Sequence, residues 1–415
     1  MFYSSGVDFE DTPTEAAFRA EARAWLEANA IPKGHPDDFS AGIWTSAYTE
    51  DVYVKRCREW QGRLAEGGWA GITWPAEYGG RGGRPIEAAI FNQEQARFGV
   101  SNGVFAIAIG MVGPTLLAHG TEDQKCRYLP AMLRGDEVWC QLFSEPDAGS
   151  DLANLGTRAV LDADGWVVTG QKVWTSTAER AEWGILLARS DPDAPKHRGI
   201  TYFLVDMGTP GIEIRPLRQM TGDSHFSEVF LDQVRIPAAN VLGAVGEGWK
   251  VTQTTLASER TAIAGGSGGA DPPGLISLAR AFGKADDPLT RQVVVEAHLR
   301  SELLRFLRLR AQTALSHGTR PGAETSVMKL AYARFMQHMT TTAIHLQGAT
   351  GMLAGPHLPS GGVWTTKFLH SPSLRIAGGS DQVQANIIGE RVLGLPAEAR
   401  VDKDGPFRDL AKAGR

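Results

Sequence analysis

The sequence has little of several features that would indicate its class directly. Its 415 residues include three cysteines, Cys57, Cys126 and Cys140, which are widely spaced and form no CxxC pair. This spacing fits neither a disulfide framework nor a zinc site, and it indicates free thiols in a reducing compartment. The ten histidines include no HExxH motif. We therefore expect no metal site.

Long apolar runs and an excess of positive charge are also missing. No apolar segment reaches the roughly 20 residues that a membrane helix requires, and the acidic start, MFYSSGVDFEDTPTE, lacks a leader pattern. With 42 Lys and Arg against 47 Asp and Glu, the formal net charge is −5. This balance argues against nucleic acid or an anionic membrane as a partner. We expect a soluble, cytoplasmic protein.

Nucleotide-binding and hydrolase signatures are absent or lie in the wrong context. The GxxxxGK[ST] phosphate loop does not occur, and the glycines at 243, 246 and 248 lie in no βαβ unit. The segment 265–269, GGSGG, formally fits the GxSxG nucleophile elbow. That elbow needs a strand before it, whereas this segment follows a predicted helix and leads into Asp-Pro-Pro. We interpret it as a flexible loop.

The pattern of apolar residues changes twice along the chain. Helical spacing predicts helices at 15–30, 50–65, 85–98, 104–119 and 122–135, the last broken by Pro130. From Val138 to about Val241, short segments rich in β-branched and aromatic residues alternate with Gly, Asp and Pro, including an Asp164-Gly165 hairpin signal. Helical patterns return at 251–264, 289–316, 324–347 and 381–392.

This order predicts an α+β multidomain protein with an antiparallel β domain between two helical domains. We place the N-terminal α-helical domain at residues 1–137, the middle β domain at 138–242 and a C-terminal helical bundle at 243–415. A chain of this length can bury a large core.

Two segments of the middle region carry the first candidate functional residues. Residues 140–151, CQLFSEPDAGSD, begin in an apolar run and turn near Pro146 and Gly149. Residues 170–177, GQKVWTST, read as a strand whose alternation places Trp174 and Ser176 on one face. An indole beside a hydroxyl suits a flat redox ring. The ring would pack on the indole, and the hydroxyl would form a hydrogen bond with the edge of the ring. An ordinary β-sheet core with turn residues would account for the same pattern.

The two segments together resemble the flavin-binding signature of the acyl-CoA dehydrogenase family. Similar blocks continue in the family's order: GIEIRPLRQMTGDSHFSEVFLDQVRIPAANVLG, GEGWKV, LASERT, QGATGM and IAGGSDQVQANIIGERVLGLP. The resemblance covers most of the chain. It implies FAD as the cofactor, an acyl-CoA as the substrate in lipid metabolism, and an electron-transfer flavoprotein as the electron acceptor. It also implies the same order of helical, β and helical domains.

The resemblance assigns contacts to the flavin ring and its neighbours. It places Phe143 and Ser144 at the flavin pyrimidine end, and Gly149 and Ser150 against the pyrophosphate or the acyl-CoA pantetheine. It places the indole of residue 174 beside the isoalloxazine and the hydroxyl of Ser176 near N5. A hydroxyl donor at N5 would stabilise the charge that arrives with a hydride.

A second group of contacts lies near the end of the chain. The resemblance implies that Gln347, Gly348 and Gly351 contact the pyrophosphate of a neighbouring subunit's flavin, and that Ser380 and Gln382 lie at the adenosine end. A flavin site completed across a subunit contact implies a homodimer or a homotetramer.

The general base is predicted on a helix. Many family members carry a Glu in a block of the form I-Y-E-G-T, but residues 376–380 read IAGGS, so Gly378 stands where the Glu would be. A second subgroup carries the base in an L-x-x-E-R block, which corresponds to residues 256–260, LASER. We predict Glu259 as the base, with Ser150, Arg260 and Gly378 contacting the acyl-CoA. The backbone N–H of Gly378 would polarise the thioester oxygen.

Helical spacing supports a role for Glu259. Trp249, Leu256 and Ile263 recur every seven residues, which predicts that Glu259 lies on the buried side of this helix. A buried carboxylate is costly unless it is paired or used in chemistry. The alternative is that Glu259 only packs or is held by Arg260.

Two departures from the family pattern leave other functions open. The R-x-x-F-G block is one residue short here, so the cross-subunit arginine is either Arg280 or Arg291. This change, together with Gly378, suits a partly competent subunit of a hetero-oligomer, although the intact residues at 144, 174, 176 and 259 argue against it. A flavin oxidase or monooxygenase on the same fold is the other alternative. The small Ala377-Gly378 pair would leave room for a bulky or branched acyl group.

Overall fold

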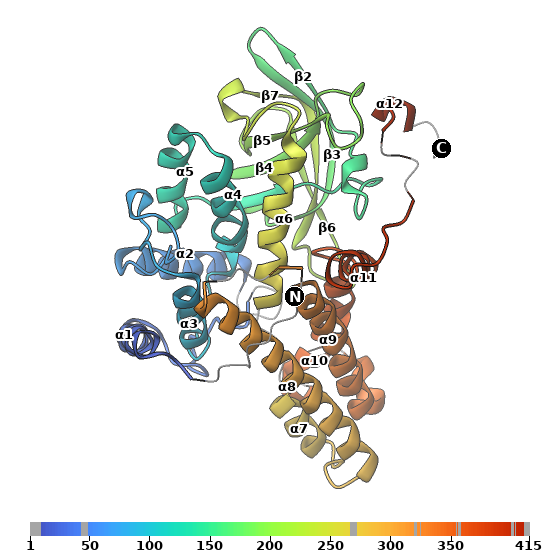
Figure 1. The fold of residues 1–415 in the computed structure, drawn as a ribbon. Coiled ribbons are helices and arrows are strands. Elements are labelled where there is room, and N and C mark those ends of the chain that lie inside the picture. The colour runs from blue at the N-terminus through green and yellow to red at the C-terminus, as the bar shows by residue number, and fades with distance from the viewer. Residues whose placement is uncertain are drawn as a thin grey trace. The chain divides into compact units, whose positions relative to one another are not determined.

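The computed structural model describes residues 10–42, 49–265, 272–318, 322–323, 325–353, 355, 358–399, 402 and 404–410 (Figure 1). The chain forms two compact units. Unit 1 comprises Met1–Arg56, Gly82–Ser101 and Arg260–Pro396, and unit 2 comprises Cys57–Arg81, Asn102–Glu259 and Ala397–Arg415. Most of the GGSGG segment that we interpreted as a loop lies outside the described residues.

Unit 1 is helical. Its members are α1 (Pro13–Asn29), α3 (Pro85–Gln95), α7 (Pro272–Ala281), α8 (Pro288–Ser316), α9 (Thr325–Gln347), α10 (Val363–His370) and α11 (Asp381–Ile387). Helix α2 (Glu50–Glu66) and helix α6 (Gly248–Gly265) are divided between the units. In Figure 1, α7, α8, α9 and α10 lie side by side as a bundle whose buried core includes Leu275, Phe335, Met339 and Trp364. The sequence did not predict α7 and α10.

Local capping explains where α1 begins. Thr12 accepts a hydrogen bond from the Glu15 N–H (3.3 Å), and the Glu15 carboxylate accepts one from the Thr12 N–H (3.0 Å). This capping box satisfies two N–H groups that the helix leaves unpaired. The other oxygen of Glu15 accepts a bond from the Ser316 hydroxyl at the end of α8 (2.6 Å), which joins two helices that are far apart in the sequence.

A buried carboxylate on α3 predicts how the stability of unit 1 depends on pH. Glu94 is 3% exposed and is held by Arg19 and Arg23 of α1 and by Arg97. The hydrogen bond from Arg23 and the neighbouring guanidiniums lower the pKa of Glu94 from 4.5 to about 2. A carboxyl whose pKa falls on folding stabilises the native state above its unfolded pKa, and this stabilisation disappears as the pH falls toward 2.

We therefore expect Glu94→Gln to lower the free energy of unfolding by about 2 kcal/mol at pH 7. This is less than for a fully buried pair, because Arg23 and Arg97 are 43% and 61% exposed. Urea unfolding at several pH values measures the effect, and the gap between the proteins should shrink between pH 5 and pH 3. A gap that stays constant over this range would contradict the assigned role of Glu94.

Unit 2 contains helices α4 (Gly113–His119) and α5 (Glu122–Arg134). The prediction that Pro130 breaks α5 was wrong, because the helix continues through it to a left-handed Gly135 cap. The predicted single helix at 104–119 is instead a 3₁₀ turn (Gly103–Phe105), a π turn (Ala108–Val112) and α4. Gly113 lies at this change of winding, where a Cβ would overlap the Trp74 ring at 2.0 Å.

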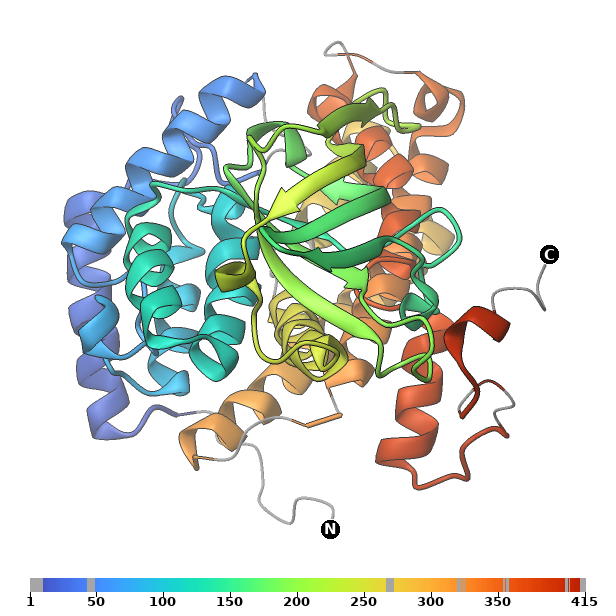
Figure 2. The same cartoon turned by 90° about the horizontal axis from the view of Figure 1, so that it is seen from above.

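The middle of unit 2 is a seven-stranded sheet (Figure 2). Its strands are β1 (Trp139–Leu142), β2 (Arg158–Asp162), β3 (Gly165–Ser176), β4 (Trp183–Arg189), β5 (Ile200–Asp206), β6 (Ile212–Leu217) and β7 (Phe226–Ile236). The order is β1-β4-β2-β3-β7-β6, and β5 pairs with β4. The predicted hairpin joins β2 and β3. The sheet is mainly antiparallel, as expected, although β1 runs parallel to β4.

The end of the chain packs on this sheet within unit 2. Helix α12 (Phe407–Leu410) buries Phe407 below the Arg189 guanidinium, which lies 3.8 Å from the centre of the ring. The buried Lys196 donates to Asp402 (2.7 Å) and also to Asp151 (2.6 Å) in the signature segment. In the part of the chain that the structure describes, every helix is too short or too polar to span a bilayer.

Candidate flavin site

The signature segment begins with a closed turn after β1. Glu145 and Ala148 exchange backbone hydrogen bonds (2.9 and 3.1 Å), which closes the turn around Pro146 and Asp147. The ring of Phe143 is buried edge-on against Tyr202 at a centroid distance of 5.8 Å. Because its side chain belongs to the core, only the backbone of Phe143 is left to contact a ligand.

The other predicted residues of this segment lie closer to solvent. Ser144 is half-buried, whereas Gly149 and Ser150 are exposed. A Cβ built at Gly149 would meet no atom within 4 Å. The turn therefore presents an open backbone surface on which a phosphate or a pantetheine chain could lie.

Strand β3 carries an irregularity at the second signature segment. The register with β7 shifts between Lys172 and Thr175, so one extra residue forms a bulge. Trp174 lies in this bulge with φ of 61°, in the left-handed region that side chains other than glycine rarely adopt. Its indole is 60% exposed and meets Phe226 edge-on at 6.0 Å.

The bulge changes how the side chains alternate along β3. Thr175 is fully buried, while Trp174 is exposed and Ser176 is half-buried. A strained backbone that holds a large apolar ring in solvent is a feature of binding sites. The exposed indole with a hydroxyl nearby fits a flat aromatic ligand.

A backbone hydrogen bond joins the bulge to the turn. The Val173 N–H donates to the Ser144 carbonyl at 2.9 Å. The structure therefore brings Phe143, Ser144, Trp174 and Ser176 together in unit 2. Gly149 and Ser150 lie at the far end of the same turn.

Helix α6 carries the predicted base. Thr252 and Thr255 are fully buried, and the Thr255 hydroxyl lies 3.0 Å from the Thr115 hydroxyl and 3.1 Å from the Tyr202 hydroxyl. Burial raises the pKa of the Tyr202 hydroxyl, which keeps it neutral. Tyr202 also packs against Phe143. It therefore links α6 to the signature turn.

Glu259 follows Thr255 by one helical turn, on the same face of α6. The prediction that Glu259 lies on the buried side was too strong, because the residue is half-buried. Among the side chains of α6 that the structure describes, those of Val251, Thr252 and Thr255 are buried, one to two turns earlier. Trp249 and Leu256 pack at the edge of this core. The side chains of Arg260 and Ile263 lie outside the described part of the structure.

The first group of predicted contacts in unit 1 lies at the end of α9. Gln347 is 3% exposed, and its amide nitrogen donates to the Ala343 carbonyl (3.3 Å). Its side-chain oxygen has no hydrogen-bond partner among the described residues. Buried acceptors without a partner are uncommon, and a ligand or another chain at this position would supply the missing donor. Gly348 follows with φ of 58°, and Gly351 is buried.

The second group lies before α11. Gly378 and Gly379 both have left-handed backbones, with φ of 64° and 84°. The Gln384 amide donates to the Gly378 carbonyl (2.8 Å), and the fully buried Lys329 donates to the Gly379 carbonyl (2.6 Å). Ser380 caps α11 through the Val383 N–H (3.3 Å). Gln382 on the same helix is exposed, as are Arg280 and Arg291 at the ends of α7 and α8.

Comparison with known proteins identifies the family. Models of the acyl-CoA dehydrogenase N-terminal, middle and C-terminal domains match residues 12–136, 140–234 and 246–393. Acyl-CoA dehydrogenase IpdE1 of Mycolicibacterium smegmatis is 38% identical over 400 residues, which cover 92% of this chain and 98% of that protein. The chain belongs to the acyl-CoA dehydrogenase family. It is an oxidoreductase of this family, as the sequence predicted.

Other relatives and solved structures of the family are also similar to this chain. Acyl-CoA dehydrogenase FadE34 of Mycobacterium tuberculosis is 45% identical over 338 residues; these are 80% of this chain but 45% of that protein, so this chain spans less than half its length. Among solved structures, the Tcur3481-Tcur3483 steroid ACAD matches at 29% identity with a TM-score of 0.80, over 94% of this chain and all of that one. The ChsE4-ChsE5 complex of M. tuberculosis matches at 28% with a TM-score of 0.75 over the same shares.

FAD is the general cofactor of this family, and the geometry fits it. The exposed indole of Trp174 and the hydroxyl of Ser176 suit the isoalloxazine, and the open turn at Gly149 suits a pyrophosphate. Sequence reasoning missed two charged groups behind these residues: the fully buried Lys172 and the largely buried Glu145. The signal was visible, since Lys172 stands in a predicted strand directly before the apolar Val173 and Trp174.

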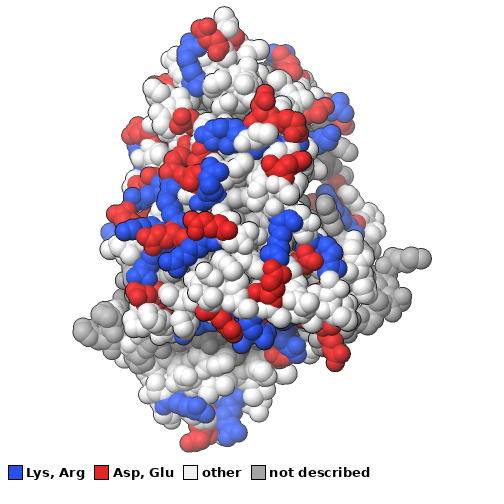
Figure 3. Space-filling model, turned by 90° about the vertical axis from the view of Figure 1, so that its left-hand side faces the viewer, with Lys and Arg blue, Asp and Glu red and all other residues white. Residues whose placement is uncertain are grey.

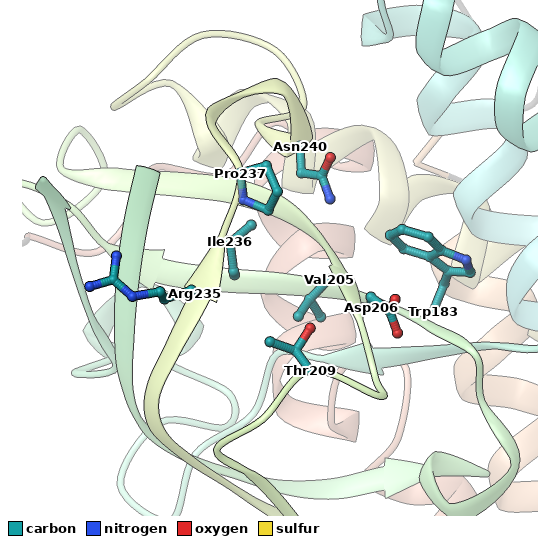
Figure 4. A pocket seen from close by; sticks show the side chains of 8 residues that line it. All are labelled: Trp183, Val205, Asp206, Thr209, Arg235, Ile236, Pro237 and Asn240. Atoms are coloured by element: carbon teal, nitrogen blue, oxygen red, sulfur yellow. The ribbon is translucent and has the colours of Figure 1, made fainter. Parts of the chain in front are cut away.

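A separate depression of about 340 Å³ lies elsewhere on the β-sheet unit of this acyl-CoA dehydrogenase. Arg235 and Trp183 stand at its opposite sides, and Asp206 and Asn240 lie between them (Figure 4). It contains none of the predicted flavin residues. On the face shown in Figure 3, basic and acidic side chains are interspersed among the coloured atoms, which agrees with the near balance of charges.

Proposed function

We propose that this acyl-CoA dehydrogenase uses FAD to convert an acyl-CoA into a trans-2-enoyl-CoA, with Glu259 as the base. The observation that carries the proposal is the exposed indole of Trp174, held in a left-handed bulge beside Ser176 and tied to Ser144. When bound, FAD would accept the hydride that leaves the β-carbon.

The residues of the chain would divide the remaining work. Glu259 removes the α-proton. Its carboxylate is half-buried beyond the buried turn of α6, so a substrate can reach it. Position 378, where many family members carry a glutamate base, is a glycine here. Ser176 donates a hydrogen bond to the edge of the ring that receives negative charge. We assign the N–H of Gly378 to the thioester oxygen, and the hydrogen bond from Gln384 to the Gly378 carbonyl holds the next peptide of this loop in place.

We propose a bulky or branched acyl group as the substrate class. One similar solved structure is described as a steroid ACAD. The residue before the predicted thioester contact is Ala377, and residue 378 is glycine, so neither brings a large side chain to this loop. An electron-transfer flavoprotein is the proposed acceptor.

Anaerobic titration with acyl-CoAs tests this function. We expect the purified protein to be yellow and to lose its visible flavin absorbance on addition of a branched or steroid-derived acyl-CoA, more completely than with a straight chain of the same length. A yellow protein that no acyl-CoA bleaches would contradict acyl-CoA dehydrogenation. Rapid oxygen uptake during turnover would instead support a flavin oxidase.

The placement of the flavin contacts in unit 1 supports an oligomer. Lys329 holds the loop before Ser380, and it precedes Gln347 on α9 by 18 residues, which is about 27 Å along the axis. The adenosine of FAD is bonded directly to its pyrophosphate. One FAD cannot bridge two contact groups this far apart, so we propose that they serve two flavins in a homodimer or homotetramer.

Helix α8 presents a surface that a second copy could cover. Val295, Leu299, Leu303 and Phe306 are 37–63% exposed and recur every three or four residues, so they share one face.

The second candidate function is a subunit of a hetero-oligomer. The observation that favours it is that two similar solved structures carry paired names, Tcur3481-Tcur3483 and ChsE4-ChsE5. Light scattering of the purified chain, with its flavin content per chain, distinguishes these assemblies.

A further inference from the structure

A largely buried ion pair lies directly behind the predicted flavin residues of unit 2, with Lys172 0% and Glu145 10% exposed. Lys172 on β3 is 0% exposed, and its ammonium donates to the Glu145 carboxylate at 2.7 Å and to the Phe143 carbonyl at 3.1 Å. Both acceptors belong to the signature turn. The lysine itself stands two residues before Trp174, at the edge of the bulge.

Glu145 connects the pair to a third segment. The same carboxylate accepts hydrogen bonds from the Gly156 N–H (2.6 Å) and the Thr157 N–H (3.0 Å) in the loop that leads into β2. The ion pair thus joins the signature turn, this loop and the bulged strand. Its two side chains together form hydrogen bonds with backbone groups of the turn and of the loop.

The energetics indicate that the ion pair fixes the geometry of the turn and adds little to stability. Burial lowers the pKa of Lys172, and the attraction of Glu145 opposes this. Burial would raise the pKa of Glu145, but the nearby lysine and the backbone donors lower it overall. A buried ion pair contributes little net stability compared with apolar residues of the same volume. What an apolar pair would not supply is a directed bond to the Phe143 carbonyl.

We propose that Lys172 is a positioning residue of the flavin site. By holding the Phe143 carbonyl, it fixes the peptide of Phe143 and Ser144 relative to the bulge that carries Trp174. The indole of Trp174, which would contact the isoalloxazine, and the Phe143–Ser144 backbone, which would contact the pyrimidine end, are thereby held at a constant separation before the cofactor binds. This inference rests on the proposed use of FAD.

Three variants separate the bond to Phe143 from the ion pair. Lys172→Met removes both and leaves Glu145 buried and uncompensated, so a loss of thermal stability is expected. Lys172→Met/Glu145→Gln removes the stranded charge and should recover most of that stability. Glu145→Gln alone keeps an amine that can bond the Phe143 carbonyl. Val205→Ala, a core substitution on β5, serves as a control for lost stability alone.

The readouts are the thermal midpoint of the apoprotein, the dissociation constant for added FAD, and the visible circular dichroism of bound flavin. We expect the double variant to bind FAD at least tenfold more weakly than wild type, with an altered flavin dichroism, although its midpoint is largely restored. Glu145→Gln and Val205→Ala should change FAD affinity less than threefold.

Wild-type affinity and dichroism in the double variant would overturn the inference. An equal loss of affinity in Glu145→Gln would also overturn it, since the Phe143 bond would not be the deciding contact. If the wild-type apoprotein takes up no FAD, the proposed function itself fails. That result is separate from both outcomes for the variants.

Discussion

Glu259→Gln is expected to lower the rate of flavin reduction by an acyl-CoA by about 10²–10⁴-fold, the range that a general base contributes. Gln has nearly the same shape as Glu but cannot take up the α-proton. The residue is half-buried on α6, one turn beyond the buried Thr255, so the substitution should leave the core of unit 2 unchanged. Anaerobic stopped-flow absorbance measures the rate of the reductive half-reaction directly.

The matched control is Glu247→Gln, which makes the same chemical change at an exposed carboxylate just before the same helix. It should keep the wild-type rate. Glu259→Gln should also keep its FAD content, since no predicted cofactor contact involves this side chain. If Glu259→Gln retains most of its reduction rate, the base is another residue and the assignment from the LASER block is wrong.

The sequence predicted the regular elements well because their signals are local. Helices at 15–30, 50–65 and 289–316 have apolar residues at helical spacing with capping or proline residues at their ends, and each was found within one or two residues. Pro130 misled the prediction, since a proline is usually read as a helix breaker. Here tertiary packing keeps the helix continuous through the proline, because Leu129, Ala131 and Met132 around it are all buried.

The candidate site was harder to predict because its geometry depends on contacts between distant segments. Alternation in a regular strand explained why Trp174 and Ser176 could act together, but only the pairing with β7 reveals the bulge and the left-handed backbone at Trp174. The roles of Lys172 and Glu145 depend on a turn 27 residues away in the sequence. No local pattern specifies such a pair.

The same reasoning accounts for the departure at Gly378. From sequence alone, a glycine where relatives carry a glutamate is only a missing base. In the structure, Gly378 and Gly379 form two consecutive left-handed residues whose carbonyls are held by Gln384 and Lys329. A side chain at either position would be strained. The loop is therefore built around glycine, which agrees with a base located elsewhere.

Gly170→Val is expected to lower the free energy of unfolding of this protein by roughly 3 kcal/mol or more, at the upper end for overpacking. Gly170 lies in β3 against the loop that carries Thr157, and a Cβ there would approach the Thr157 hydroxyl at 2.4 Å and its Cα at 2.8 Å. Two backbone segments would have to separate, and the Thr157 N–H is one of the donors that hold Glu145.

Gly149→Val makes the same change in the other signature segment and should have the opposite consequences. A Cβ at Gly149 meets no atom within 4 Å, so stability should change by less than about 0.5 kcal/mol, as at other surface positions. The added side chain would fill the open surface proposed for a phosphate or pantetheine, so the affinity for FAD or acyl-CoA should fall. Urea unfolding and ligand titration of both variants measure this contrast. Equal stability losses would mean that Gly149 is retained for folding and not for a ligand.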